Sequence, residues 1–425
     1  MIRAGRYYDV LVALLLLLGP GLSLASETKC IKGCWCESSD TDVSVQCTNF
    51  PGDSVPSLTS LDLASKNVSL MLDQPGLKKV ARKDLQVGGK LIRVTIVGSP
   101  ELVYDVDAFS DSASTLTSLD LDVGDYRFDQ VFSVVSELGA LEKLTLRCQG
   151  KAGDPILLTQ PIVSGPVTQS LRELSIRSCE VKHVLAEALT GLDNLTGLSL
   201  PKNVLRDIPR FLSTLPLTSV HLDTNRIAHP DLGQLPKTLK LLSLSDNGVI
   251  TMSPYVAAEL PNLASMDLSD NPHFTPSPST FEEYSRGFLN LARTNLDTLD
   301  ILHGGPESPP PAVSLEISGT KVPCSCQLQH LLVVHKADIS GTCVTLGNGT
   351  LHIPGPQLAQ YLKSVDCDCL TDPKQPCASG VSKMRQEWLE AHIPGSAGRR
   401  GTTSSSPREA AAVCLAVFLL TAWVQ

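Results

Sequence analysis

The chain has 425 residues, a formal net charge of −9 and an aromatic content of only 4%. This acidic balance gives the chain no overall attraction to nucleic acid or to anionic membrane surfaces. The low aromatic content indicates an aliphatic core, and the length fits either about two or three domains or one long repeat array.

Residues 1–25 have the features of a secretory signal peptide. Arg3 and Arg6 precede the apolar run Val10–Leu18, and Ser23-Leu24-Ala25 supplies small residues for cleavage. The run is short for a membrane span, so we expect removal of this segment. Export leads to an oxidising compartment, where cysteines form disulfides.

The cysteines fit this compartment. Besides Cys414 there are twelve, in sets of four, two and six: Cys30, Cys34, Cys36 and Cys47; Cys148 and Cys179; and Cys324, Cys326, Cys343, Cys367, Cys369 and Cys377. The first set lacks the paired C-x2-C spacing of zinc sites, so a metal site is not expected there.

Irregular leucine triplets follow the first cysteines. They predict an opening coil at Leu58–Leu63 and further coils at Leu91–Ile96, Leu116–Leu121, Leu141–Leu146 and Leu171–Ile176. The segment Gly150–Pro166 is rich in glycine and proline and predicts an inserted loop.

The clearest pattern spans Leu195–Asn271, where the phrase L-x-x-L-x-L-x-x-N-x-L recurs. Four copies start 22, 22 and 24 residues apart, with asparagines at 203, 225, 247 and 271. The fourth and sixth positions alternate with polar ones, which predicts a short strand with one buried face. The asparagine must turn the chain while its amide bonds to backbone groups of neighbouring coils. An amphipathic helix would not place asparagine at a fixed offset, and the pattern resembles a leucine-rich repeat, whose coils bury their leucines by stacking.

Regularity fades after Asn271. We expect a helix over Phe281–Leu291, a strand over Leu296–Ile301, a stiff loop at Pro306–Pro311 and a last short coil over Leu315–Val322.

Both cysteine-rich ends resemble the caps of extracellular leucine-rich repeat proteins. The second begins with Cys324-Ser325-Cys326, although the family's tryptophan after this motif is absent here. The resemblance implies an α/β solenoid, or horseshoe, with a parallel sheet on its concave face, an irregular convex side and a disulfide cap at each end. The implied disulfides are Cys30–Cys36, Cys34–Cys47, Cys324–Cys343 and Cys326–Cys367.

Two further pairings stay open. Cys148 and Cys179 stand at almost the same position of adjacent coils. Neighbouring strands lie roughly 4.8 Å apart, within the reach of a disulfide, so a bridge fits and two buried free thiols fit equally. Cys369 and Cys377 either pair with each other or exchange with Cys367.

The C-terminal tail resembles the signal for a glycosylphosphatidylinositol (GPI) anchor. Small residues at Ser396-Ala397-Gly398 precede a polar spacer and the apolar run Ala410–Val424. We expect attachment at Ser396, with Gly401 or Ser404 as alternatives, and removal of the rest. One alternative is a transmembrane helix, which needs about 20 apolar residues and is normally followed by basic residues. The apolar run here has 15 residues and only Gln425 follows it. A secreted form is the remaining alternative.

The predicted organisation is a signal peptide (1–25), an N-terminal cap (26–57), about ten or eleven coils (58–322), a C-terminal cap (323–378), a stalk (379–396) and a removed propeptide (397–425). Sequons predict N-glycosylation at Asn67, Asn194 and Asn348.

Function is expected to lie in binding. The sequence contains no H-E-x-x-H, G-x-S-x-G or P-loop motif, so we expect no enzyme, cofactor or metal site. In a solenoid the polar strand positions line the concave face. There the sequence predicts a basic group that Glu173 interrupts, and an acidic group further on: Lys143, Arg147, Arg172 and Arg177, then His221, Asp223, Asp246, Asp267, Asp270 and Asp300.

Such a charge division would orient a protein partner. We expect a lipid-anchored cell-surface protein that binds an extracellular protein ligand or a transmembrane co-receptor, in adhesion or as a co-receptor itself. Alternatives are an innate-immune recognition protein for microbial ligands and an extracellular matrix binding protein. Nucleic acid is not an expected partner, and a homodimer stays open.

Overall fold

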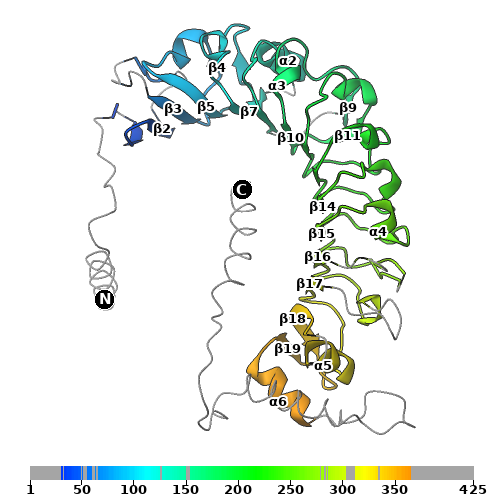
Figure 1. Ribbon diagram of the computed structural model, residues 1–425. Coiled ribbons are helices and arrows are strands. Elements are labelled where there is room, and N and C mark those ends of the chain that lie inside the picture. The colour runs from blue at the N-terminus through cyan, green and yellow to red at the C-terminus, as the bar shows by residue number, and fades with distance from the viewer. Residues whose placement is uncertain are drawn as a thin grey trace, which may run out of the picture.

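The computed structural model describes residues 30–31, 33–48, 50, 55–59, 63, 66–124, 127–149, 154–277, 279–281, 284, 286–302, 312–333 and 336–364. They form an arc whose inner side carries one long sheet, with most helices on its outer side and the last helix at its C-terminal end (Figure 1). This is the predicted leucine-rich repeat solenoid. The predicted signal peptide, stalk and anchor tail with Ser396, the loop Pro306–Pro311, and Cys367, Cys369 and Cys377 lie outside the described residues.

The main sheet has 15 strands. In spatial order they are β1 (Cys34–Ser38), β2 (Asp42–Thr48), β3 (Asn67–Asp73), β5 (Lys90–Val97), β7 (Ser118–Val123), β8 (Lys143–Cys148), β10 (Glu173–Arg177), β12 (Gly197–Ser199), β13 (Ser219–His221), β14 (Leu241–Ser243), β15 (Ser265–Asp267), β16 (Arg286–Asn290), β17 (Ala312–Glu316), β18 (Asp338–Val344) and β19 (Thr350–Ile353). Neighbouring strands of this sheet pair in parallel, except in the antiparallel hairpins β1–β2 and β18–β19 at its two ends.

The connections between these strands hold short elements. Two small parallel sheets pair β4 (Lys79–Val80) with β6 (Val103–Tyr104) and β9 (Ile156–Leu158) with β11 (Val181–Val184). The helices are α2 (Phe128–Val135), α3 (Val167–Ser170), α4 (Val256–Glu259), α5 (Cys326–Val333) and α6 (Pro356–Ser364). The 3-10 helices are η1 (Arg82–Leu85), η2 (Ser110–Ser112), η4 (Ala186–Leu189), η5 (Leu212–Thr214), η6 (Leu232–Gln234) and η7 (Asp300–Leu302).

The core is a continuous stack of aliphatic side chains between the sheet and the convex segments. The fourth and sixth residues of successive coils, such as Leu198, Leu222, Leu244 and Leu268, are buried throughout. A single coil could not enclose these side chains, so each coil depends on its neighbours for burial.

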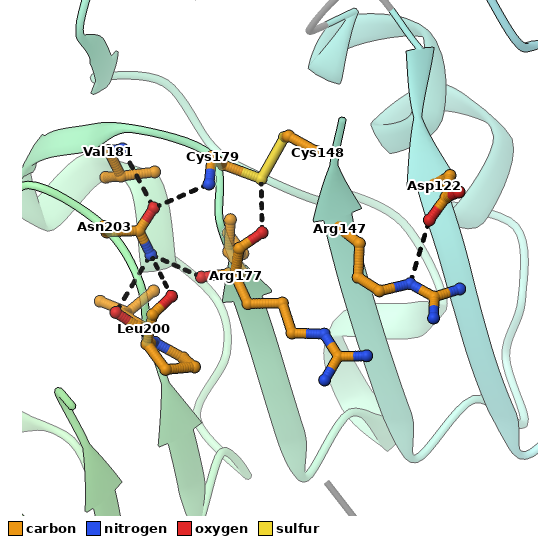
Figure 2. The surroundings of a disulfide bond; sticks show 10 residues. Asp122, Arg147, Cys148, Arg177, Cys179, Val181, Leu200 and Asn203 are labelled. Carbon is orange, nitrogen blue, oxygen red and sulfur yellow. Dashed lines mark hydrogen bonds and ion pairs between the residues drawn. A yellow bond between two sulfur atoms is a disulfide. The ribbon is translucent and has the colours of Figure 1, made fainter. Parts of the chain in front are cut away.

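The repeated asparagines act as predicted. Asn203 Oδ1 accepts the backbone N–H groups of Cys179 and Val181 at 3.1 Å, and its Nδ2 donates to the Ile176 carbonyl at 2.8 Å (Figure 2). These partners belong to the preceding coil. Equivalent buried bonds come from Asn225, Asn247 and Asn271. Each amide therefore satisfies backbone groups that the turn would otherwise leave buried and unpaired.

Two predicted elements beyond Asn271 are wrong. The segment Phe281–Leu291 contains strand β16 instead of a helix, and Leu296–Ile301 leads into η7 instead of a strand. Leu289 lies opposite Met266 of β15, which keeps the length of the earlier coils. A helix there would have left the long parallel sheet without a strand in this coil.

The first half of the solenoid differs from the prediction in two places. The strand of the opening coil is β3, with Val68 and Leu70 buried, whereas Leu58 and Leu63 are buried in the connection before it. The predicted loop Gly150–Pro166 contains β9. Both strands are short apolar stretches without the asparagine that marks the regular coils.

Disulfides lie near both ends of the solenoid and in its middle. The structure contains Cys30–Cys36, Cys34–Cys47, Cys324–Cys343 and the inter-coil bridge Cys148–Cys179. Cys326 is also disulfide-bonded; Cys367, the partner implied by the family, is outside the described residues. Cys34–Cys47 joins the two strands of the N-terminal hairpin, and the C-terminal hairpin contains Cys343, whose partner Cys324 precedes α5.

Candidate functional site

The candidate site is the concave face of the main sheet. Side chains alternate across a strand, so the residues between the buried leucines point into the arc. Short hydroxyl side chains fill much of this face: Ser44, Ser69, Thr95, Ser118, Thr145, Ser175, Ser199, Ser219, Ser243, Ser265, Ser314 and Ser340. The longer charged side chains of the face extend beyond these small side chains.

The central basic residues are already paired with carboxylates of the same face. Arg147 Nε lies 3.0 Å from Asp122 Oδ1 and 3.3 Å from Asp120 Oδ1. Figure 2 shows Arg147 reaching from β8 to Asp122 on β7, with Arg177 extended beside it on β10. Lys143 forms an ion pair with Glu173 at 3.0 Å. Lys143 and Arg147, two of the four predicted basic residues, are therefore paired with acids within the sheet.

Asp122 is the most enclosed charge of this cluster. Its side chain is 3% exposed and accepts the Gly98 N–H at 3.1 Å and an amide proton of Gln149. Burial raises the pKa of Asp122, and Arg147 opposes that rise. Burial likewise raises the pKa of Asp120, again opposed by Arg147. The guanidinium therefore offsets part of the hydration that these carboxylates lose on burial.

Carboxylates further along the face have different partners. Asp223 accepts hydroxyl protons from Ser243 and, at 3.4 Å, from Ser245. Burial raises the pKa of Asp223, and His221 opposes the rise. Asp267 accepts the Ser269 N–H at 2.9 Å. In this region hydroxyl and amide donors, instead of lysine or arginine, hold the carboxylates in place.

Ser219, His221 and Asp223 form a chain that superficially resembles a hydrolytic triad. Ser219 Oγ lies 3.0 Å from His221 Nε2, and His221 Nδ1 lies 4.0 Å from Asp223 Oδ2. The nearby N–H groups of Leu222 and Leu244 donate to carbonyls of adjacent strands, so they are not free to hold an oxyanion. This arrangement suits recognition.

The remaining predicted face residues are at its margins or off it. Arg172 is exposed just before β10, and Asp246 and Asp270 lie in left-handed turns beyond β14 and β15, with Asp270 bound to Arg293. The placement of Asp300 on the face is wrong: it lies on η7 and accepts the Gln327 amide at 2.6 Å. It leaves the face because the strand of that coil is β16.

Sequence reasoning missed several face residues. Asp120 and Asp122 occupy the fifth and seventh positions of an irregular coil, and Glu316 and Asp338 lie on β17 and β18. Leu241 is an exposed leucine beside the buried Leu242. Applying the positional rule to every leucine triplet, with or without a following asparagine, would have found Asp120 and Asp122.

The three predicted glycosylation sites differ in setting. Asn194 and Asn348 are exposed, in the segment before β12 and in the β18–β19 turn. Asn67 begins β3, where its Nδ2 donates to Asp42 Oδ1 at 3.1 Å. A glycan at Asn67 would replace one of the two Nδ2 hydrogens, so a single N–H would remain to donate to Asp42.

Within the described ranges, no group of three or more histidine, cysteine or acidic side chains is placed to hold a metal. Helices long and apolar enough to cross a bilayer are also missing from the residues that the structure describes. A hollow of about 700 Å³ beside η4, η5 and η6 is lined by both acidic and basic residues, including Lys182, Glu187 and Asp207.

Comparison with known proteins supports this architecture. No family model matches the chain. Fibromodulin of Oryctolagus cuniculus is 33% identical over 108 residues, which cover 25% of this chain and 73% of that protein. Fibromodulin of Sus scrofa is 32% identical over 108 residues, with the same coverage of 25% and 73%. Tsukushi of Gallus gallus is 32% identical over 114 residues, or 26% of this chain and 31% of that protein. Together with the stacked coils and terminal disulfides, these similarities show that the chain belongs to the extracellular leucine-rich repeat proteins.

Proposed function

We propose that this chain is a cell-surface protein that binds an extracellular protein ligand through the concave face of its sheet, in adhesion or as a co-receptor. One observation carries the proposal: the face is long, polar and uncovered by any described helix (Figure 1). Exposed side chains such as Lys143, Glu173 and Leu241 stand on its strands. A rigid curved sheet with fixed charges supplies a surface that a protein can match without rearrangement of the backbone.

The proposed anchorage follows from the sequence. A GPI anchor at Ser396 would hold the mature chain, with its predicted caps and stalk, in the outer leaflet of the plasma membrane. An anchor without a cytoplasmic segment cannot signal alone, so a transmembrane partner would carry the signal. Release of the protein from cells by a phosphatidylinositol-specific phospholipase is the expected result. Appearance of all the protein in the medium would instead favour the secreted, matrix-binding alternative.

The concave face can be tested with added glycans. Asp267→Asn creates the sequon Asn-Leu-Ser on β15, and Arg93→Asn creates Asn-Val-Thr on β5. Ser110→Asn creates Asn-Asp-Ser on η2, away from the sheet, as the matched control. Occupancy is checked by the mass shift of each purified ectodomain, residues 26–396.

Each glycosylated ectodomain is then used to capture proteins from living cell surfaces. We expect at least one wild-type partner to be lost with a concave glycan and kept with the control glycan. Retention of every partner by both concave variants would refute binding through this face. Binding of the wild-type ectodomain in a separate screen of microbial glycans and lipids, with no host protein captured, would favour the innate-immune alternative.

A further inference from the structure

We propose that the C-terminal half of the concave face, from β13 to β18, docks an extended segment of a protein partner in which Lys or Arg side chains flank an apolar one. This inference rests on the proposed function and makes it specific, because it assigns the half of the face and the chemistry of the partner.

The two halves of the concave face differ in how their charged residues are paired. Lys143 and Arg147 are bound to carboxylates on the strands around β8, so acids and bases compensate each other there. In the other half, Asp223 and Asp267 are held by hydroxyl or amide donors. Those donors fix the position of a carboxylate and leave its negative charge in place.

The acidic character continues to the end of the sheet. Glu316 accepts the Ser318 N–H and the Ser340 hydroxyl, each at 2.8 Å, and Asp338 accepts the Ser314 hydroxyl. The guanidinium of Arg293 is bound to Asp270 at the margin, and its positive charge also interacts with Asp267 and Glu316, so one cation is shared among several acids. The face therefore holds a row of positioned carboxylates whose described hydrogen-bond donors are uncharged, and their complement is a set of cations on a partner.

An apolar side chain lies among these acids. Leu241 on β14 is 42% exposed, although its register neighbours on both sides are serines, Ser219 and Ser265. The partly buried Phe288 follows Ser265 in the same row. Because Leu241 projects beyond the short hydroxyl side chains around it, an apolar side chain of a partner can pack on it and exclude water from the contact.

The spacing of these groups fits an extended chain. Asp267 lies one strand and two residues from Leu241, which is roughly 8 Å from the strand spacing and the rise per residue. Side chains three residues apart on one side of a polyproline II segment are separated by roughly 9.3 Å. An apolar residue on Leu241 can thus place a nearby Lys or Arg beside Asp267.

A second acid follows along the same row. Asp267 pairs in register with Asn290, which pairs with Glu316. Two strand spacings are roughly 9.6 Å, or about three residues of extended chain. A segment that crosses the strands in the extended polyproline II conformation, which has three residues per turn, would therefore present every third side chain, and so its cations, to the face.

The direct test uses a defined probe. A fluorescein-labelled 12-residue peptide carries arginine at every third position and one central leucine, and its control carries glutamine in place of arginine. Binding to the full ectodomain is measured by fluorescence anisotropy at low and at physiological salt. We expect the arginine peptide to bind, to weaken as salt rises, and to lose most of its binding when arginine is replaced.

Charge variants locate the site. The site variant combines Asp246→Asn, Asp267→Ser and Glu316→Gln, which add no sequon. The control variant removes the same number of exposed carboxylates off the main sheet, by Glu187→Gln, Asp193→Asn and Asp207→Asn. We expect the site variant to weaken peptide binding at least tenfold and the control variant to change it less than twofold.

A third variant and a folding check complete the design. Leu241→Ser, which matches its serine neighbours, should weaken binding several-fold without changing the circular dichroism spectrum. Equal affinity of the site and control variants would overturn the inference, as would peptide binding that does not respond to Leu241→Ser. If the glycan at position 93 removes a cell-surface partner and that at position 267 does not, the proposed function survives and this inference fails.

Discussion

Replacing Arg147 with methionine would leave the Asp122 carboxylate in the sheet without its ion-pair partner. Asp122 is almost fully buried, and the Arg147 side chain is 21% exposed. Removing one member of a buried pair typically costs about 3–5 kcal/mol. Because Arg147 keeps some contact with solvent, we expect a loss near the lower end, about 3 kcal/mol. Urea unfolding of the ectodomain, followed by far-ultraviolet circular dichroism, measures this loss.

The loss should depend on pH in a defined direction. Burial raises the pKa of Asp122, and Arg147 opposes that rise, so the variant has a still higher folded-state pKa. Its folded form then keeps a proton that the unfolded chain releases as the pH rises. Stability from that proton is present at acidic pH and lost as the pH rises through the folded pKa. The deficit relative to wild type should therefore be largest near neutral pH and shrink toward about pH 4–5.

A matched control separates this effect from the loss of any surface charge. The Lys143–Glu173 pair shares strand β8 with Arg147, but its side chains are 53% and 56% exposed. Lys143→Met should cost less than about 1 kcal/mol. Equal losses in the two variants, or a deficit for Arg147→Met that stays constant with pH, would refute the buried-pair reasoning.

Three further changes test the architecture. Leu242→Ala should cost about 3 kcal/mol because it opens a cavity in the stack, whereas Leu241→Ala, one residue away on the other face, should cost less than about 1 kcal/mol in urea unfolding. Asn247→Ala should cost about 3 kcal/mol by leaving buried backbone groups of the neighbouring coil unpaired, and hydrogen exchange should become faster at those amides. Replacing both Cys148 and Cys179 with alanine removes a bridge with a sequence separation of 31 and should cost about 3–4 kcal/mol, measured under non-reducing conditions. For each of the three destabilising changes, an unchanged urea midpoint would contradict the reasoning behind it.

The sequence determined the repeat architecture wherever apolar periodicity and asparagine occur together. Leu222 and Asn225, for example, are constrained by burial and by backbone hydrogen bonding at the same time, and no other short element requires both at that spacing. In the irregular coils only one constraint is visible. Thr294 takes the place of asparagine before η7 and donates to the Leu291 carbonyl at 2.7 Å. The coil that contains β16 thus lacks the asparagine, and its segment Phe281–Leu291 was predicted as a helix.

Tertiary structure alone decided how the charges of the concave face are used. The sequence placed Lys143, Arg147 and Arg177 in neighbouring coils, and it could not show that Arg147 reaches back to Asp122 and Asp120. Such pairs depend on the register between strands that are about 25 residues apart in the chain. The sequence also left Cys148 and Cys179 open between bridge and free thiols, and the distance between adjacent coils decided it. Periodicity thus sets which side of a strand a residue faces, whereas stacking sets which residues of other coils it meets.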